Sequence, residues 1–194
     1  MDRTLASDKG SNAGVSASIE RQRLVARLHA GAAYPITLLI APAGYGKSIV
    51  LRQYLKSLRE PNACFALRAE HAELLGFLRG FSEALQGIAP HAITTLAGAY
   101  ERNSASPKRG ADLARWMDAH LESFTGLIAV DDLHIADGEP EVTTFLSSLI
   151  EQTKERVRWI LASRSKAGLP VTTWQAYHDA DTPIDERDLR FTLD

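Results

Sequence analysis

Eight consecutive residues combine glycines, a lysine and a hydroxyl in the order Ala-Pro-Ala-Gly-Tyr-Gly-Lys-Ser. Gly44 and Gly46 let backbone N–H groups curl around an anion, where a Cβ would collide or demand a strained torsion. Lys47 would place its ammonium near the β- and γ-phosphates of a nucleotide. The Ser48 hydroxyl would ligate Mg2+ at the start of a helix whose dipole favours anions. The segment therefore predicts a phosphate-binding P-loop.

One position departs from the P-loop template, because Ala41 stands where the first glycine is usual. Alanine is the smallest departure available, and the surrounding pattern is the expected one. The apolar run 36–41 enters the loop, and the amphipathic segment 50–58 follows it. This context argues against a glycine-rich turn with an incidental lysine.

Two adjacent carboxylates could supply the acidic partner that a P-loop needs for its metal. Asp131 and Asp132 follow the apolar run 127–130, and carboxylates that end a buried strand are costly unless a cation meets them. We expect Asp131 to hold Mg2+, directly or through water, and Asp132 to orient or deprotonate the attacking water. His134 lies just beyond them, and a histidine in this position is more often a hydrogen-bonded loop residue than a catalytic one.

Arg164 follows a further apolar run, 157–162, and is the third component of the predicted site. A guanidinium binds phosphate bidentately, so an arginine at the end of a strand can contact the γ-phosphate and report its presence. If its position at the end of a strand is disregarded, Arg164 fits an exposed surface position equally well. The predicted catalytic residues are Lys47, Asp132 and Arg164, and the predicted metal ligands are Ser48 and Asp131. The predicted nucleotide contacts are Ala41, Pro42, Ala43, Gly44, Tyr45, Gly46, Lys47, Ser48 and Arg164.

Strand-like and helix-like patterns alternate along the chain. Apolar runs typical of buried strands lie at 36–41, 63–67, 127–130 and 157–162, with a weaker one at 184–189. Helical periodicity marks a short helix from about residue 19 to 31 and segments at 50–58, 74–88, 113–124 and 142–150, and a polar stretch at 101–110 is expected to be a loop between helices. Such alternation indicates right-handed crossovers and a doubly wound α/β fold, with helices on both faces of a parallel sheet. Ligands bind such sheets at the carboxyl ends of the strands.

Composition narrows the functional classes. The chain has 194 residues, 45% of them hydrophobic, which is enough for one substantial core. A net charge of -2 gives no global positive field for nucleic acid or an anionic membrane. The only cysteine, Cys64, excludes an internal disulfide, is expected to be a small buried hydrophobe, and fits a cytoplasmic setting.

The ends of the chain carry weaker signals. Residues 1–17 are polar and aperiodic, which predicts a disordered leader before a domain at 18–194. No secretion signal or membrane span is evident. The chain stops soon after the last candidate strand, without a closing helix, so we expect a fragment of a longer protein.

Taken together, these features resemble the N-terminal nucleotide-binding module of the large ATP-dependent LuxR-type transcription regulators. This is the MalT-like branch of the STAND class of signal-transducing NTPases, and the resemblance covers residues 19 to 194. The matching segments are 21–24, 38–48, 77–86, 130–134, 161–164 and 188–192.

The resemblance implies a P-loop NTPase core with a five-stranded sheet in the order 5-1-4-3-2, which puts the Arg164 strand between those of the P-loop and Asp131. It also implies ATP or ADP with Mg2+, and an oligomeric active state favoured by ATP together with an inducer. For the isolated module we expect slow ATP hydrolysis or none. DNA would be contacted only through later domains that are absent from this chain.

Three departures limit the resemblance. Ser48 replaces a more usual threonine, and segment 64–67 differs from the common strand sequence. Residues 166–178 replace a leucine- and arginine-rich helix, which puts any arginine from that helix in doubt.

The favoured hypothesis is a regulatory ATP switch of a signal-responsive transcription regulator. A small P-loop enzyme, such as a nucleotide or metabolite kinase, is an alternative, although the arginine-rich lid of such enzymes is not evident. A non-hydrolysing nucleotide-binding scaffold is another. The basic run Lys154, Arg156 and Arg158 is interleaved with Glu155 and preceded by Glu151, so a solvated face is favoured over a nucleic-acid patch.

Overall fold

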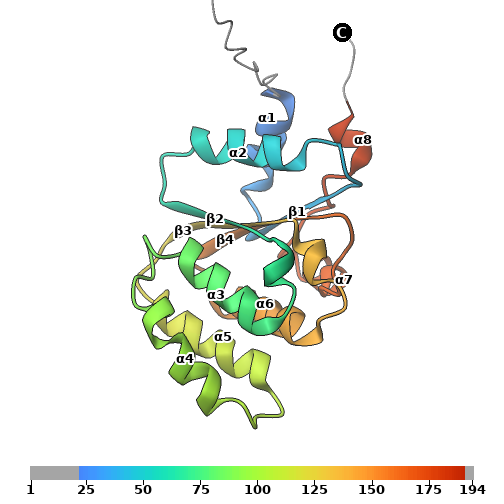
Figure 1. Cartoon of the computed structure of the whole chain (residues 1–194). Coiled ribbons are helices and arrows are strands. Elements are labelled where there is room, and N and C mark those ends of the chain that lie inside the picture. Colours follow the sequence, from blue (N-terminus) through green and yellow to red (C-terminus); the bar gives the residue numbers. More distant parts are fainter. Residues whose placement is uncertain (1–21, 191–194) are drawn as a thin grey trace, which may run out of the picture.

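Four of the five apolar runs form strands of one parallel sheet, and helices on both faces shelter the apolar side chains of all but the β2 edge. The computed structural model describes residues 22–190 (Figure 1), so the predicted leader at 1–17 lies outside the described residues. The strands are β1 (Ile36–Ile40), β2 (Asn62–Ala66), β3 (Gly126–Asp131) and β4 (Val157–Ser163). Their order is β1-β4-β3-β2, which places β4 between the P-loop strand and the Asp131 strand as expected.

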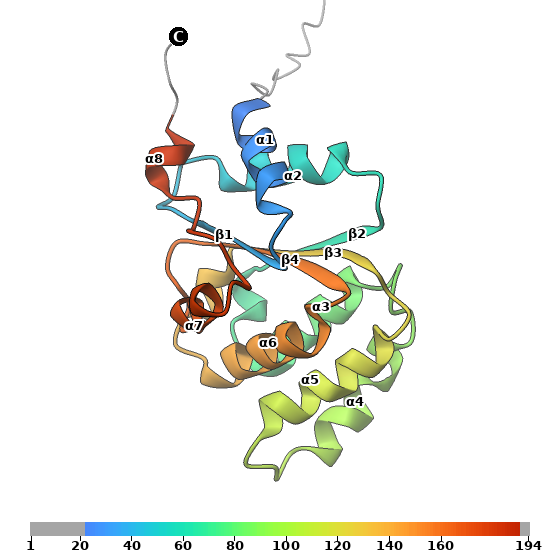
Figure 2. The same cartoon turned by 180° about the vertical axis from the view of Figure 1, so that it is seen from behind.

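Two helical layers enclose the sheet (Figures 1 and 2). On one face lie α1 (Gln22–Gly31), α2 (Lys47–Ser57) and α8 (Glu186–Leu189). On the other lie α3 (Leu74–Ala84), α4 (Ala92–Arg102), α5 (Arg109–His120), α6 (Pro140–Thr153) and α7 (Val171–Ala176). The alternation along β1 divides the core, since Leu39 packs in the cluster under α1 and α2 and Leu38 packs in the larger cluster on the opposite face. Two short 3-10 helices, η1 (Ala69–His71) and η2 (Leu133–Ala136), follow β2 and β3.

The helix α4 is a feature that the sequence patterns did not predict. Its buried residues are Ala92, Leu96 and Ala99, and two small side chains out of three leave a weak hydrophobic period. The polar stretch predicted as a loop between helices does separate α4 from α5, although the loop itself is narrower than 101–110. None of the helices among residues 22–190 combines the length and apolar character required to cross a bilayer.

The predicted fifth strand at 184–189 is wrong: within residues 22–190 the sheet has four strands, and the order 5-1-4-3-2 becomes 1-4-3-2. Ile184 makes a single parallel bridge to Leu39, and Ala180 makes another to Ile36. Pro183 lacks the N–H that a continuous ladder needs. Asp185 then caps α8 by accepting from the N–H of Arg187, which turns the chain into a helix.

The opposite edge of the sheet corrects another expectation. Cys64 was expected to be buried, but its side chain is exposed on β2, as are Asn62 and Ala66. Phe65 alternates with them and is buried against α3. The apolar run is therefore an edge strand that is covered on one face only.

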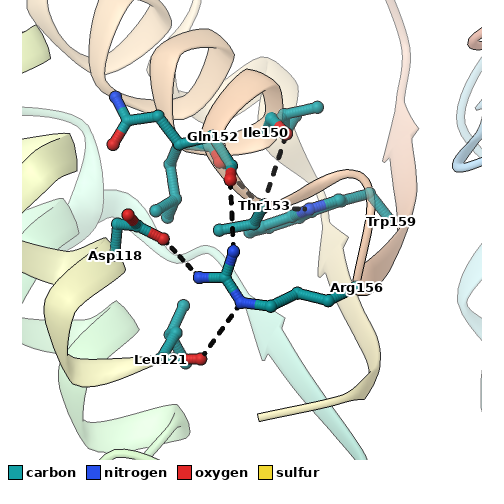
Figure 3. A network of polar contacts seen from close by, with 8 residues as sticks. Asp118, Leu121, Ile150, Gln152, Thr153, Arg156 and Trp159 are labelled. Atoms are coloured by element: carbon teal, nitrogen blue, oxygen red, sulfur yellow. Dashed lines mark hydrogen bonds and ion pairs between the residues drawn. The ribbon is translucent and has the colours of Figure 1, made fainter. Parts of the chain in front are cut away.

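The basic run after α6 is neither a nucleic-acid patch nor a freely solvated face. Each of its three cations is partly buried and paired: Lys154 with Asp179 and Glu151, Arg156 with Asp118, and Arg158 with Glu60. Arg156 also donates to the backbone carbonyls of Leu121 and Gln152 (Figure 3). These contacts join the ends of α5 and α6 at the amino-terminal edge of the sheet, away from the P-loop.

Candidate nucleotide-binding site

The P-loop connects β1 to α2, and its backbone explains which positions need glycine. Gly44 has φ +86°, and Gly46, which precedes the first turn of α2, has φ +77°. Both angles lie in the left-handed region that disfavours a side chain. A Cβ on Gly44 would meet no protein atom within 4 Å, so the loop keeps open space on that side, where a phosphate could approach.

Ala41 shows why the template's first glycine is dispensable here. It is not among the described residues with positive φ, and its N–H donates to the carbonyl of Ser163 at 3.2 Å. This bond continues the pairing between β1 and β4 by one residue. The methyl group is 2% exposed and packs in the core beneath α2, so alanine adds apolar contact without strain.

Lys47 lies inside the loop that precedes it. Its side chain is buried, and Nζ donates to the carbonyls of Ala41 at 2.6 Å and Pro42 at 3.0 Å. Burial lowers the pKa of Lys47, the charges of Asp132 and Asp131 act in the opposite direction, and Arg164 adds to the lowering. The ammonium is thus held among backbone dipoles within the field of two carboxylates.

Asp131 ends β3 as a buried carboxylate, only 5% exposed. Burial raises its pKa, and the charge of Asp132 raises it further. The hydroxyl of Ser48 and the N–H of Asp132 both donate to the carboxylate and, with the charge of Lys47, oppose that shift. The two predicted metal ligands, one from α2 and one from β3, are therefore in contact.

This pair of ligands fits Mg2+ bound together with a nucleotide. Magnesium in phosphate sites takes one or two protein oxygens and completes its coordination with phosphate and water. A buried carboxylate beside a hydroxyl provides such oxygens. A nearby cation also stabilises a desolvated carboxylate more than it stabilises a carboxylate in water.

Asp132 adopts an unusual backbone, with φ +56°, as the residue that precedes η2. Its side chain is 39% exposed, and its Oδ1 lies 3.7 Å from Nδ1 of His134. Burial and, second, the charge of Arg164 lower the pKa of His134, which keeps this imidazole largely neutral near pH 7. The sequence did not favour His134, but the tight turn of η2 brings it back beside Asp132.

Arg164 follows β4 directly and is exposed. With the P-loop it lines a cavity of about 280 Å³ whose walls are Ala43, Gly44, Gly46, Lys47, Ser48, Ile49, Asp132 and Arg164. Three neighbouring strand ends thus supply one hollow, as the rule for parallel sheets predicts. Ile49 is the lining residue that sequence reasoning missed, and its side chain is 41% exposed there.

Three predicted contacts, Ala41, Pro42 and Tyr45, do not line this cavity. Tyr45 is half-buried and packs against the core between α1 and α2. A larger hollow of about 540 Å³ lies at the start of α6 between Asp137 and Gly168, and it includes none of the predicted site residues. Because the charged groups converge on the smaller cavity, we assign the candidate site to it.

Comparison with known proteins identifies the family of this chain. The profile of the AAA domain family matches residues 32–167, a range that includes the P-loop, both aspartates and Arg164. The chain belongs to the AAA domain family. As an AAA domain with a P-loop at the carboxyl edge of a parallel sheet, it is a nucleotide-binding module of the P-loop NTPase type.

Similar segments occur within longer proteins. This chain is 26% identical over 180 residues to serine/threonine-protein kinase PknK of two strains of Mycobacterium tuberculosis and one of Mycobacterium bovis. The match covers 91% of this chain but only 16% of those relatives. Among solved structures, a Walker-type ATPase of Pyrococcus abyssi is similar over 75% of this chain and 45% of its own, with 17% identity and a TM-score of 0.48.

Proposed function

We propose that the chain is the ATP-binding switch of a larger signal-responsive regulator, and that it holds nucleotide for long periods and hydrolyses it slowly. The observation that carries the proposal is the convergence of Lys47, Ser48, Asp132 and Arg164 on one cavity, with Asp131 in contact with Ser48. These groups come from the ends of β1, β4 and β3, which are neighbours in the sheet.

Each side chain has a chemical task in this proposal. Lys47 and the N–H groups around Gly44 and Gly46 bind the phosphates of ATP. Ser48 and Asp131 hold Mg2+, which neutralises phosphate charge when it is bound.

The hydrolytic tasks fall to the other two strand ends. Asp132, which lines the cavity beside Lys47 and Arg164, orients the attacking water. Arg164 contacts the terminal phosphate and distinguishes ATP from ADP.

The regulatory part of the proposal rests on the resemblance to MalT-like STAND regulators and on the length of the relatives. In PknK a similar segment is 16% of a longer protein, which supports a module that acts on other domains. We propose that the ATP state favours self-association and that any contact with DNA is made by domains absent from this chain. Helical repeats and a helix-turn-helix encoded beyond Asp194 would support the transcriptional form.

Lys47→Ala tests the nucleotide site. We expect at least a hundredfold loss of affinity for a fluorescent ATP analogue with Mg2+, because the buried ammonium supplies a charge-assisted bond that no neighbour replaces. The matched control is Lys56→Ala, an exposed lysine on the same helix, which should bind normally. Equal affinity of the Lys47 variant and the wild type would overturn the site.

The rate of ATP hydrolysis distinguishes a regulatory switch from a kinase and from a non-hydrolysing scaffold. Asp132→Ala should retain nucleotide binding and abolish a slow ATPase measured by phosphate release. Fast turnover that requires a small-molecule acceptor would favour a kinase, and an absence of turnover in the wild type would favour a non-hydrolysing scaffold. Neither alternative predicts a slow, acceptor-independent rate that Asp132→Ala removes.

A further inference from the structure

Arg164 is the residue of the candidate site that its own side chain does not hold in place. It is exposed at the end of β4, and among residues 22–190 its guanidinium makes no hydrogen bond or ion pair. Lys47, by contrast, is buried and bonds to two backbone carbonyls. The position of the guanidinium beside the cavity therefore depends on the backbone of the loop that carries it.

That loop, residues 164–169, is a tight turn with an uncommon backbone. Leu169 donates its N–H to Lys166 O at 2.9 Å, and Ala167 and Gly168 have φ +50° and +68°. The left-handed region disfavours a side chain, so Ala167 keeps this conformation only where surrounding contacts fix it. The loop therefore needs hydrogen-bond partners that hold its shape.

The serines on either side of Arg164 supply part of this support. The hydroxyl of Ser163, a buried residue, accepts from the N–H of Ser165 at 3.3 Å, and the hydroxyl of Ser165 accepts from the N–H of Ala167 at 3.0 Å. Ser163 also accepts from the N–H of Ala41 through its C=O, at 3.2 Å. The start of the loop is thus fixed to the sheet and to the P-loop strand.

Two side-chain hydrogen bonds join the loop to other elements. Thr143 on α6 donates its hydroxyl to Ala167 O at 3.2 Å, and Ser165 donates its hydroxyl to Oδ2 of Asp137 at 2.6 Å. Asp137 lies 28 positions earlier in the chain than Ser165. Because Ser165 adjoins Arg164, the contact with Asp137 restricts where Arg164 can lie.

Asp137 is itself connected to the nucleotide cavity. It follows η2 directly, and Asp132 precedes the same short helix. The carbonyl of Asp132 accepts from the helix at 3.0 Å, and the N–H of Asp137 donates back into it at 3.1 Å. The Ser165–Asp137 bond therefore completes a continuous connection between Asp132 and Arg164, two residues that line one cavity.

The exposure of the two partners indicates a contact that affects position more than stability. Asp137 is exposed and Ser165 is half-buried, and water readily replaces a hydrogen bond at such a place. Both residues line the larger hollow at the start of α6, and neither lines the P-loop cavity. They can therefore act on a bound nucleotide only through Arg164 or Asp132.

We propose that the hydrogen bond between Ser165 and Asp137 positions Arg164 at the terminal phosphate of ATP, and that the preference of the protein for ATP over ADP depends on this contact. The inference rests on the proposed function, which assigns recognition of the terminal phosphate to Arg164. Ser165 and Asp137 are positioning residues in this scheme. A guanidinium binds phosphate bidentately only in a defined orientation, so a displaced loop weakens that contact first.

Ser165→Ala tests the contact. The measurement is isothermal titration calorimetry with ADP and with a non-hydrolysable ATP analogue, each in the presence of Mg2+. We expect the affinity for the ATP analogue to fall on the order of tenfold, and that for ADP to change by less than about twofold, because Arg164 contacts only the terminal phosphate. A defect of the fold would instead weaken the binding of both nucleotides.

Conservative replacements and a matched control isolate the hydrogen bond. Ser165→Thr keeps a hydroxyl donor and Asp137→Asn keeps an acceptor without the charge, so both should retain most of the preference for ATP. Asp137→Ala should lose the preference as Ser165→Ala does. The control is Ser147→Ala, which removes a hydroxyl bonded to carbonyls of its own helix, at Thr143 and Thr144, and should bind both nucleotides like the wild type.

A double-mutant cycle with Arg164 determines whether the contact acts through this residue. Arg164→Ala should remove the preference for the ATP analogue, and the addition of Ser165→Ala should change the ratio of the two affinities no further. Melting curves verify that each variant folds.

The outcomes separate this inference from the proposed function. Losses that multiply in the double variant would overturn the inference, as would a normal ratio in Ser165→Ala while Arg164→Ala loses its preference. An unchanged ratio in Arg164→Ala would overturn the role of Arg164 in the proposed function, and the inference with it.

Discussion

Asp131 illustrates how one residue of the site carries a cost for the empty fold. Its carboxylate is 5% exposed, and burial raises its pKa. A raised carboxylate pKa means that the folded state disfavours the ionised form that exists at neutral pH. The buried Asp131 carboxylate therefore lowers the stability of the folded protein at neutral pH.

Replacing Asp131 with asparagine should reveal this cost. Asp131→Asn keeps an oxygen that can accept from Ser48 and removes the desolvated charge, so the nucleotide-free protein should melt a few degrees higher at neutral pH. The same variant should lose the Mg2+ dependence of nucleotide binding. Differential scanning calorimetry and titration with an ATP analogue measure the two effects, and an unchanged Mg2+ dependence would contradict the role of Asp131.

Sequence reasoning identified the charged residues of the site because their positions follow from the ends of apolar runs. Asp131 and Arg164 each come directly after such a run, and parallel strands end at the same edge. Sequence reasoning did not identify Ile49 and His134 as site residues, for two different reasons. Ile49 fits the apolar pattern of a helix yet faces the cavity, and His134 approaches Asp132 only because η2 turns tightly.

At the scale of elements, the contacts of Arg156 join the end of α5 to the end of α6 (Figure 3). Arg156→Ala should lower the free energy of unfolding by about 1–3 kcal/mol, because it leaves two backbone carbonyls and Asp118 without this donor. Arg115→Ala is the control, since Arg115 is 68% exposed and pairs only locally with Asp112; it should change stability by less than about 0.5 kcal/mol. Urea denaturation compares them, and equal losses would refute the structural role of Arg156.

The contact between α4 and α5 contains a titratable group. His120 on α5 lies 2.9 Å from the Thr95 hydroxyl on α4, and Trp116 also donates to that hydroxyl. Burial and, to a lesser extent, the charge of His91 lower the pKa of His120 from 6.5. A histidine with a lowered folded-state pKa binds its proton more tightly when the chain unfolds. Its contribution to stability is therefore complete above the unfolded pKa and is lost as the pH falls through 6.5 towards the lowered value.

His120→Gln should flatten this dependence while keeping a hydrogen-bonding side chain beside the Thr95 hydroxyl. The difference in melting temperature between about pH 7.5 and pH 5.5 should shrink relative to the wild type. It should not vanish, because burial also lowers the pKa of His134. His178→Gln, at an exposed position, is the control, and an equal effect of both variants would count against the α4–α5 contact.

The predicted elements show which patterns carry information and which do not. β1, β3 and β4 were found because burial on both faces needs uninterrupted apolar residues, and β2 because its short run is also apolar although only one of its faces is covered. The fifth failed where Pro183 and Asp185 redirect an apolar run into α8, and α4 was missed because alanines mark its buried face. Cys64 was misplaced because a local run does not reveal whether its strand lies inside the sheet or at its edge.

For the molecule as a whole, the order β1-β4-β3-β2 gathers the charged groups at one edge of the sheet and leaves β2 at its end. The strand order could be anticipated only through the resemblance to a known family, since strand pairing joins residues about a hundred positions apart, such as Leu39 and Ala162. The same order makes β2 the neighbour of the Asp131 strand. Ala66 is in register with Asp131.

That neighbourhood turns the only thiol of the protein into a chemical reporter. Although Cys64 is exposed at the sheet edge, desolvation by its neighbours raises its pKa to about 11; the negative charge of Asp131 raises this pKa as well, and the charge of Arg52 lowers it. Because only the thiolate reacts with iodoacetamide, the alkylation rate of the dilute chain measures the electric field at the surface of β2. Asp131→Asn should accelerate labelling and Arg52→Ala should slow it, and rates that moved together would show that access, and not charge, governs the reaction.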